Sequence, residues 1–291
     1  MEIIAGTTDF YLEKDTAVAI GKFDGVHLGH RRLLEEILNK KKNGLAACVF
    51  TFDPTPAVLF GLSDRKELTT REEKRRLFEH LGIDILIEFP LTKETAATEP
   101  ERFVTEILAK QMNTRFVAAG EDLSFGKNGA GNAELLEKMA PHLGFCVRTI
   151  EKIEVDGIEV SSTYIRKLVE EGRMEEAEKM LGMPYTLVGC VEHGNHIGHT
   201  LGFPTVNLLP PAGKLLPPNG VYYAVVRYNG KVYKSISNVG TKPTVSSEKV
   251  MGVESYLYDF AQDIYGQEIE VALKSFRRPE RRFGSLEELK K

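Results

Sequence analysis

The stretch GKFDGVHLGH, residues 21–30, decides the fold of the first half of the chain. An apolar run, AVAI at 17–20, precedes it, and an amphipathic segment follows it up to Gly44. This order predicts a strand, a glycine-rich turn and a helix. Glycine lets a backbone approach a ligand closely, and free N–H groups at the start of a helix attract anions. The stretch therefore predicts a phosphate-binding turn.

His27 and His30 are three residues apart in this stretch. If the helix has begun by then, this spacing puts both imidazole rings on one face of its first turn. Their N–H groups would then hold phosphate oxygens while negative charge moves between them. The alternative interpretation is an ordinary strand-to-helix turn with solvated histidines. The length of the glycine and histidine pattern favours the phosphate site.

The chain up to about Leu181 alternates strands with helices, which indicates an α/β fold with a parallel sheet. A glycine-rich loop, EDLSFGKNGAGN at 121–132, leaves the carboxyl end of one strand, where ligands bind in open α/β sheets. The predicted strands are residues 17–20, 45–52, 83–89, 114–120 and 145–150, and the later helices are predicted at 70–81, from 100 onward, and at 133–143.

A second motif, SSTYIR at 161–166, opens a predicted helix that ends near Gly172. One interpretation is that Ser162 or Thr163 only caps the helix, and the residues alone favour it. The other is that the hydroxyls, the helix N–H groups and Arg166 hold a polyphosphate leaving group, because the guanidinium fork matches phosphate oxygens.

From about Pro184 onward the chain changes to short β-rich runs separated by glycine, proline and asparagine. Asn229-Gly230 is typical of a hairpin turn, and the spacing of the runs predicts a compact antiparallel barrel. We expect an α/β domain over residues 1–182 and a β-barrel domain with a short terminal helix over 183–291. The predicted strands are residues 185–192, 220–228, 231–240, 249–260 and 268–276.

Three polar features stand out in the barrel half. Three histidines at three-residue intervals between 193 and 199 suggest a metal site. The glycines among them favour a loop over a nucleotide instead, because zinc requires a fixed geometry. Thr205 and Asn207 are two apart on a strand and so point the same way, although a surface edge strand is the alternative. Glu254 lies within an apolar strand run, where an outward-facing position is the simplest interpretation.

Composition excludes several classes of protein. The 291 residues carry a formal charge of −4, which argues against a general nucleic-acid binder, whose affinity rests on many Lys and Arg contacts. We see no signal peptide and no apolar run near ~20 residues, so we expect a cytoplasmic protein without a membrane partner. The basic clusters at 71–76 and 277–282 are interpreted as solvated, ion-paired surface. Cys48, Cys146 and Cys190 are expected to be reduced core residues.

Taken in order, nine stretches resemble the bacterial bifunctional riboflavin kinase/FAD synthetase family, and the first also resembles the HxGH nucleotidyltransferases. The resemblance implies a Rossmann-like, doubly wound FMN adenylyltransferase domain and a riboflavin kinase barrel. Together they would make FMN and then FAD from riboflavin and ATP, with Mg²⁺ as the cofactor. We expect small-molecule partners only, and a monomer or weak homo-oligomer. The stretches are GKFDGVHLGH, TFDPTP, GEDLSFG, SSTYIR, GHTLGFPTVN, PPNGVYY, SNVGTKPT, VESYLYDF with QDIYG, and RRPERRF.

The resemblance also implies roles for single residues. His27 and His30 would stabilise the α-phosphate of ATP in the adenylyltransferase, and Glu254 would take the proton from riboflavin in the kinase. Thr205 and Asn207 would hold Mg²⁺ and ATP phosphates. Further ATP contacts are implied for Gly21, Phe23, Asp24, Gly25, Ser161, Ser162, Thr163 and Arg166 in the first domain and for Gly194 and Gly198 in the second, and flavin contacts for Asp53, Asp122, Phe125, Asn238 and Arg278.

The chain departs from the family pattern at a few positions. Thr55 stands where a histidine is usual, Leu123 where a phenylalanine is usual, and Gly129 where an arginine is usual. His199 and Tyr256 are departures in the barrel half. The leading hypothesis is a bifunctional enzyme. The alternatives are a protein with only the kinase active, and a flavin-binding regulator that has lost turnover.

Overall fold

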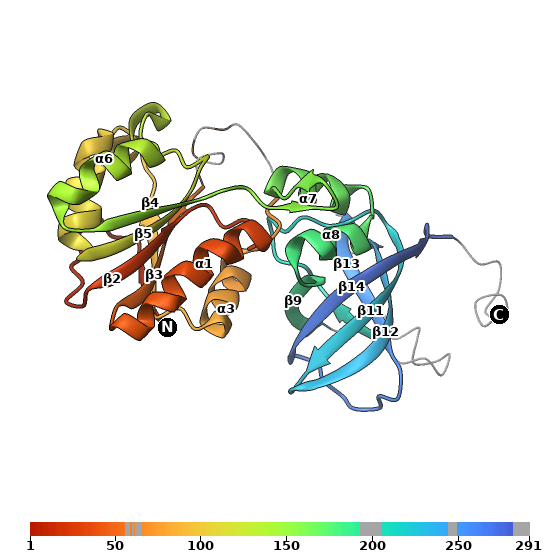
Figure 1. Ribbon diagram of the computed structural model, residues 1–291. Coiled ribbons are helices and arrows are strands. Elements are labelled where there is room, and N and C mark those ends of the chain that lie inside the picture. Colours follow the sequence, from red (N-terminus) through yellow and green to blue (C-terminus); the bar gives the residue numbers. More distant parts are fainter. Residues whose placement is uncertain (56–58, 60, 62–65, 193–204, 244–248, 282–291) are drawn as a thin grey trace. The chain divides into compact units, whose positions relative to one another are not determined.

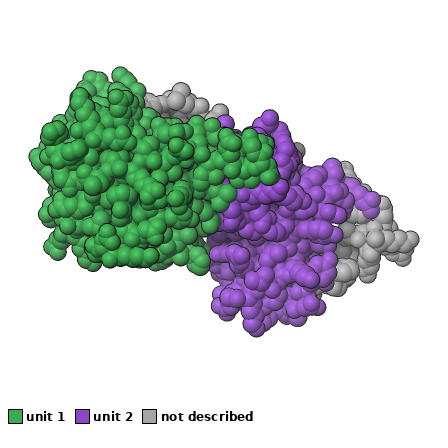
Figure 2. All heavy atoms as spheres, viewed as in Figure 1, with its two compact units in different colours: residues 1–161 green, residues 162–291 purple. Residues whose placement is uncertain are grey.

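The computed structural model describes residues 1–55, 59, 61, 66–192, 205–243 and 249–281. The chain divides into two compact units, residues 1–161 and 162–291, which Figure 2 colours separately. The first unit is a sheet covered by helices, and the second is a barrel with two helices (Figure 1).

The first unit is built on six strands that all pair in parallel, as the alternating pattern predicts. They are β1 (Glu2–Ala5), β2 (Thr16–Ile20), β3 (Ala46–Asp53), β4 (Ile85–Pro90), β5 (Thr114–Gly120) and β6 (Cys146–Ile150). The sheet order is β1-β4-β3-β2-β5-β6. From β2 the chain moves outward through β3 and β4, and then crosses to the other side of β2 for β5 and β6. The carboxyl end of β2 is therefore the switch point, where open α/β sheets bind ligands.

Helices cover both faces of this sheet. Ala17 and Ala19 of β2 contact the layer with α1 (Leu28–Lys40) and α3 (Arg71–Leu81). Val18 and Ile20 face the opposite layer, with the π-helical segment η2 (Phe103–Gln111) and α6 (Ala133–Leu143). Burial on both faces explains why the strands are nearly continuous apolar runs. Short segments complete the unit: η1 (Lys41–Asn43), α4 (Lys93–Ala96), α5 (Pro100–Arg102), η3 (Lys127–Gly129), β7 (Glu154–Val155) and β8 (Ile158–Glu159).

The second unit contains the predicted antiparallel barrel, closed in the order β10-β13-β12-β11-β14-β9. Asn229 and Gly230 have φ angles of 51° and 74°, as a tight hairpin turn between β11 and β12 requires. Buried side chains alternate along β11, which leaves every second residue for the outer face. The strands are β9 (Tyr185–Glu192), β10 (Thr205–Leu208), β11 (Gly220–Tyr228), β12 (Lys231–Pro243), β13 (Lys249–Leu257) and β14 (Glu268–Arg278).

Two helices, α7 (Ser162–Glu170) and α8 (Met174–Leu181), belong to the second compact unit. Glu178 of α8 accepts a hydrogen bond from Lys274 of β14, and Met174, Ala177 and Met180 are buried. The compact units thus divide earlier in the chain than the domain boundary predicted at 182/183, because these helices bury their apolar face within the unit that holds the barrel.

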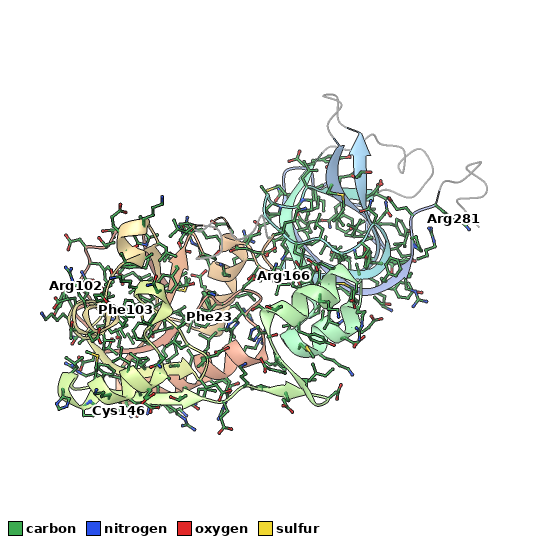
Figure 3. The ribbon with its side chains drawn as sticks, turned by 90° about the horizontal axis from the view of Figure 1, so that it is seen from above. Phe23, Arg102, Phe103, Cys146, Arg166 and Arg281 are labelled. Atoms are coloured by element: carbon green, nitrogen blue, oxygen red, sulfur yellow. The ribbon has the colours of Figure 1, made fainter. Side chains whose placement is uncertain are left out.

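Two further expectations have different outcomes. All three cysteines are free, but only Cys48 is buried, so the expected core position is wrong for Cys146 (Figure 3) and Cys190. Cys146 lies on β6, the last strand in the order of the sheet. The predicted terminal helix lies outside the described residues. Within those residues, no helix is long and apolar enough to cross a membrane.

Candidate active sites

Residues 21–30, which we call the histidine turn, lie at the switch point of the parallel sheet. β2 ends at Ile20, and α1 begins at Leu28, so residues 21–27 form the connection, as predicted. His27 is the N-cap residue of α1, and its Nδ1 accepts a hydrogen bond from the backbone N–H of His30 at 3.3 Å. The two rings stack with their centroids 3.7 Å apart. Because Nδ1 of His27 accepts a hydrogen bond, the proton of the neutral ring is on Nε2, which is then a donor for a ligand.

Burial keeps both histidines neutral. It lowers the pKa of His27 to about 4, against a weaker opposing effect of the Asp122 carboxylate. The pKa of His30 is lowered well below its ordinary value by burial first, and then by the nearby His27 and the Lys74 ammonium. The Nδ1 atom of His30 is buried and has no hydrogen-bond partner among the described residues. At neutral pH the pair therefore presents N–H dipoles rather than full positive charges.

We expect this buried pair to make folding sensitive to acid. Unfolded His27 binds a proton below its ordinary pKa of 6.5, whereas folded His27 does so only near 4. Between these values the unfolded state binds more protons, so the free energy of unfolding falls as the pH falls. At about 1.4 kcal/mol per pKa unit, His27 accounts for roughly 3 kcal/mol across this window.

The measurement is urea unfolding at several pH values, for the natural chain and for His27→Asn. Asparagine is a good N-cap residue and does not titrate, so the variant is expected to lose less stability on acidification. His80→Asn is the matched control, because His80 is exposed on α3 and should leave the pH dependence unchanged. An identical pH dependence for His27→Asn and the natural chain would contradict this account.

Three predicted ATP contacts in the turn have structural partners. The ring of Phe23 is fully buried and packs edge-to-face on Phe78 of α3, with centroids 5.5 Å apart. Asp24 is 9% exposed, and its Oδ1 accepts hydrogen bonds from backbone N–H groups outside the turn. The N–H of Gly25 donates to a threonine hydroxyl of the same neighbouring segment. The N–H of Gly25 is therefore already paired, because the turn packs against the residues before α3.

The predicted flavin contacts of the first unit lie at or after the ends of β3 and β5, the two strands that flank β2. Asp53 ends β3 and forms an ion pair with Arg71 at 2.9 Å. Asp122 follows the end of β5 and is close enough to His27 to influence its charge. Phe125 is only 3% exposed and packs on Phe103 of η2, with ring centroids 5.2 Å apart. Phe125 is therefore part of the core, and the two aspartates lie at the carboxyl ends of their strands. The flavin contacts of all three residues stay predictions.

The SSTYIR motif lies where the two compact units divide. Ser161 is the last residue of the first unit, and α7 begins at Ser162. The motif opens a helix, as predicted, but Ser162 and Thr163 lie inside it, so the expected cap at one of them is wrong. Thr163 lies in the first turn of α7 and Arg166 at its middle, and Arg166 is labelled in Figure 3. The roles of these four residues in ATP binding remain predictions.

The second group of predicted residues meets on the barrel. Glu254 of β13 lies directly opposite Asn207 of β10 on one side and Asn238 of β12 on the other. Thr205 lies two residues before Asn207, and its hydroxyl donates a hydrogen bond to Oε1 of Glu254 at 2.6 Å. Strand register thus brings together residues that are far apart in the sequence, and their side chains alternate with the buried Val206 and Ser255. The row formed by Asn207, Glu254 and Asn238 is a polar site across three strands.

Asn238 and Arg278, the other predicted residues of the barrel that the structure describes, lie near the end of β14. The side-chain amide of Asn238 donates to Oε1 of Glu280 at 2.9 Å, which ties β12 to the segment after β14. Arg278 ends β14 beside Val221 and donates to the carbonyl of Pro279 at 3.2 Å. Gly194 and Gly198, and the three histidines between 193 and 199, lie outside the described residues. Within the described part of the chain, no group of three His, Cys, Asp or Glu residues is arranged to hold a metal ion.

The basic cluster at 71–76 is ion-paired, as predicted, but it is not solvated throughout. Arg71 and Arg75 both donate to the carboxylate of Glu88, whose side chain is 4% exposed, at 2.8 Å and 2.6 Å. Lys74 is 7% exposed and lies 3.8 Å from Glu67. The sequence signal for its burial was helical spacing, because Lys74 precedes the buried Phe78 by four residues and shares its face.

Neutral imidazoles at the switch point of a parallel sheet, and a carboxylate beside neutral oxygen groups on a barrel, are groups expected of an enzyme that transfers groups from a nucleoside triphosphate. A family model described as FAD synthetase matches residues 11–164, and one described as riboflavin kinase matches residues 181–291. The bifunctional riboflavin kinase/FMN adenylyltransferase of Listeria monocytogenes is 36% identical over 97% of this chain and 90% of its own length. That of Escherichia coli K12 is 35% identical over 96% of this chain and 89% of its own length.

The chain belongs to the family of bifunctional riboflavin kinase/FMN adenylyltransferases. It phosphorylates riboflavin with ATP to give FMN, and adenylates FMN with ATP to give FAD. A crystal structure described as a macrolide-efflux protein from Streptococcus pneumoniae has the same fold, with a TM-score of 0.85 and 28% identity over 99% of this chain and 94% of that one.

Proposed function

We propose that the two reactions use separate sites. Phosphoryl transfer takes place at the row of Asn207, Glu254 and Asn238 on the barrel, and adenylyl transfer takes place at the histidine turn. The observation that carries the barrel assignment is the 2.6 Å hydrogen bond from Thr205 to Glu254, whose register partner on the same strand as Thr205 is Asn207. It supports a carboxylate held in one orientation beside two neutral oxygen groups. These are the groups that a hydroxyl nucleophile and a nucleotide phosphate require.

At the barrel site, a hydroxyl of riboflavin attacks the γ-phosphorus of ATP. Its proton passes to Glu254 as the new P–O bond forms, and the bond to the bridging oxygen breaks to release ADP. The oxygen donors of Thr205 and Asn207 fit Mg²⁺, a hard cation that keeps water and phosphate partners. When bound, the ion would offset charge on the ATP phosphates. Asn238 and Arg278 are proposed to contact the flavin, and Gly194 and Gly198 the nucleotide.

At the histidine turn, a phosphate oxygen of FMN attacks the α-phosphorus of the second ATP, and pyrophosphate leaves. The attacking phosphate needs no strong base, because its second pKa is ~6 by analogy with phosphoserine. The neutral histidines support this proposal, because they supply N–H donors that stabilise the negative charge on the α-phosphate rather than act as bases. Asp53 and Asp122 are proposed to position the flavin, and Ser161, Ser162, Thr163 and Arg166 to bind ATP phosphates.

The experiment that tests the proposal is an incubation of the protein with riboflavin, ATP and Mg²⁺, followed by separation of the flavins. We expect FMN to appear first and FAD to follow, and we expect a metal chelator to stop FMN formation. FMN alone would mean that only the kinase is active, and unchanged riboflavin with measurable binding would indicate a regulator. We further propose that the reactions take place in the cytoplasm, where ATP is available, with a monomer or weak homo-oligomer and without nucleic acid.

A further inference from the structure

The histidine turn has a backbone that its own residues do not favour. Phe23 and Val26 have φ angles of 50° and 44°, in the left-handed region. That region is uncommon for residues other than glycine and is a genuine outlier for a β-branched residue such as valine. Such conformations persist only where surrounding contacts hold them. The turn therefore depends on groups outside it.

Those groups come from the two residues before the N-cap of α3. Oδ1 of Asp24 accepts hydrogen bonds from the backbone N–H groups of Leu68 at 2.8 Å and Thr69 at 3.2 Å. In return, the N–H of Gly25 donates to the hydroxyl of Thr69 at 2.9 Å. Asp24, Leu68 and Thr69 are all less than 10% exposed. We call this reciprocal set of hydrogen bonds the Thr69 latch.

The latch bears directly on the histidine pair. Gly25 is two residues before His27, whose N-cap hydrogen bond in turn sets the position of His30. α3 supports the same pair from a second direction, because the ring of Phe23 lies between Phe78 of α3 and the ring of His30, at centroid distances of 5.5 Å and 5.0 Å. A small displacement of a reacting group can slow a reaction about 10²-fold, so groups that hold such a turn affect the rate.

We propose that Thr69 is a positioning residue for adenylyl transfer, and that its hydroxyl holds the backbone of Gly25 so that His27 and His30 face the α-phosphate of ATP. The inference rests on the proposed function of the histidine turn. Thr69 does not touch the substrate in this account. It acts only through the turn, so its loss should lower kcat while the KM values for ATP and FMN change little.

The test compares Thr69→Val with Thr69→Ser in FAD formation from supplied FMN. Valine has the shape of threonine without the hydroxyl, and we expect kcat to fall about 10- to 100-fold with KM values within about threefold. Serine keeps the hydroxyl and should restore kcat to within about threefold. Thr69→Ala is measured in parallel, in case valine prevents folding, and we expect a smaller loss because water can reach the Gly25 amide. Phosphorylation of riboflavin should stay within about twofold in all three variants.

Thr70→Ala is the matched control for stability. Thr70 caps α3 by accepting from the N–H of Glu73, so its loss loosens the same helix start without removing a latch group. We expect it to lower the melting temperature but to leave kcat within about twofold. Any one of three results would overturn the inference. The first is an unchanged kcat in both Thr69→Val and Thr69→Ala, and the second is a loss of kcat in Thr70→Ala as large as in Thr69→Val. The third is a kcat that Thr69→Ser does not restore. His30→Ala distinguishes a failure of this inference from a failure of the proposed function. If His30→Ala leaves FAD formation intact, the proposed function of the turn is wrong. If His30→Ala stops FAD formation but the Thr69 variants do not behave as expected, only the inference about Thr69 is wrong.

Discussion

Replacement of Glu254 by glutamine is expected to stop riboflavin phosphorylation while the protein still adenylates supplied FMN. Loss of a general base lowers turnover by about 10²- to 10⁴-fold. Glutamine keeps an oxygen that accepts the hydrogen bond from Thr205, so the barrel strands should keep their register. The measurement is the rate of FMN formation from riboflavin, with FAD formation from FMN as the internal check of folding.

Glu192→Gln is the matched control for this experiment. Glu192 is an exposed acid on β9 and is the register partner of Asn207 on the side away from Glu254. It should change phosphorylation by less than about twofold, because general-base catalysis needs a group within hydrogen-bond reach of the proton. Retained kinase turnover in Glu254→Gln would show that the base is elsewhere.

Replacement of His30 by alanine is expected to stop FAD formation while FMN still accumulates from riboflavin. Removal of one donor to a developing negative charge costs about 10²- to 10³-fold in turnover. His30 also packs between His27 and Phe23, so alanine removes a ring contact on each side. The measurement is the ratio of FAD to FMN after incubation with riboflavin, ATP and Mg²⁺.

Two further variants separate chemistry from packing in this result. His30→Gln keeps much of the bulk and an amide donor, and should retain more FAD formation than alanine if hydrogen bonding matters. His80→Ala removes an exposed histidine of α3 and should leave both activities unchanged. Equal loss of FMN and FAD formation in His30→Ala would mean that the two reactions do not use separate sites.

Much of the fold could be predicted because its signals are local. The apolar runs at 45–52 and 83–89 correspond to β3 and β4, and the Asn229-Gly230 turn joins β11 to β12. β1 was missed, because it has only four residues, EIIA, and its apolar part is too short to stand out as a strand. Its pairing with β4, far along the chain, is what makes it a strand.

Packing accounts for the residues whose surroundings were misjudged. Lys74 and Glu88 are charged residues that composition assigns to the surface, yet both are buried. Glu88 tolerates burial because two arginines of α3 donate to its carboxylate. Those arginines are a helix away in sequence, and only the docking of α3 on the sheet brings them to the end of β4.

The sequence by itself determined the two-part architecture, the position of the histidine turn and the identity of the polar residues on the barrel, because each depends on residues close together in the chain. The tertiary structure alone decided which of those residues act together. Strand register placed Glu254 between Asn207 and Asn238, and packing joined Thr69 to Gly25 across 44 positions. Hydrogen bonds between distant segments form only when those segments pack against one another, and a local sequence pattern contains no information on that packing.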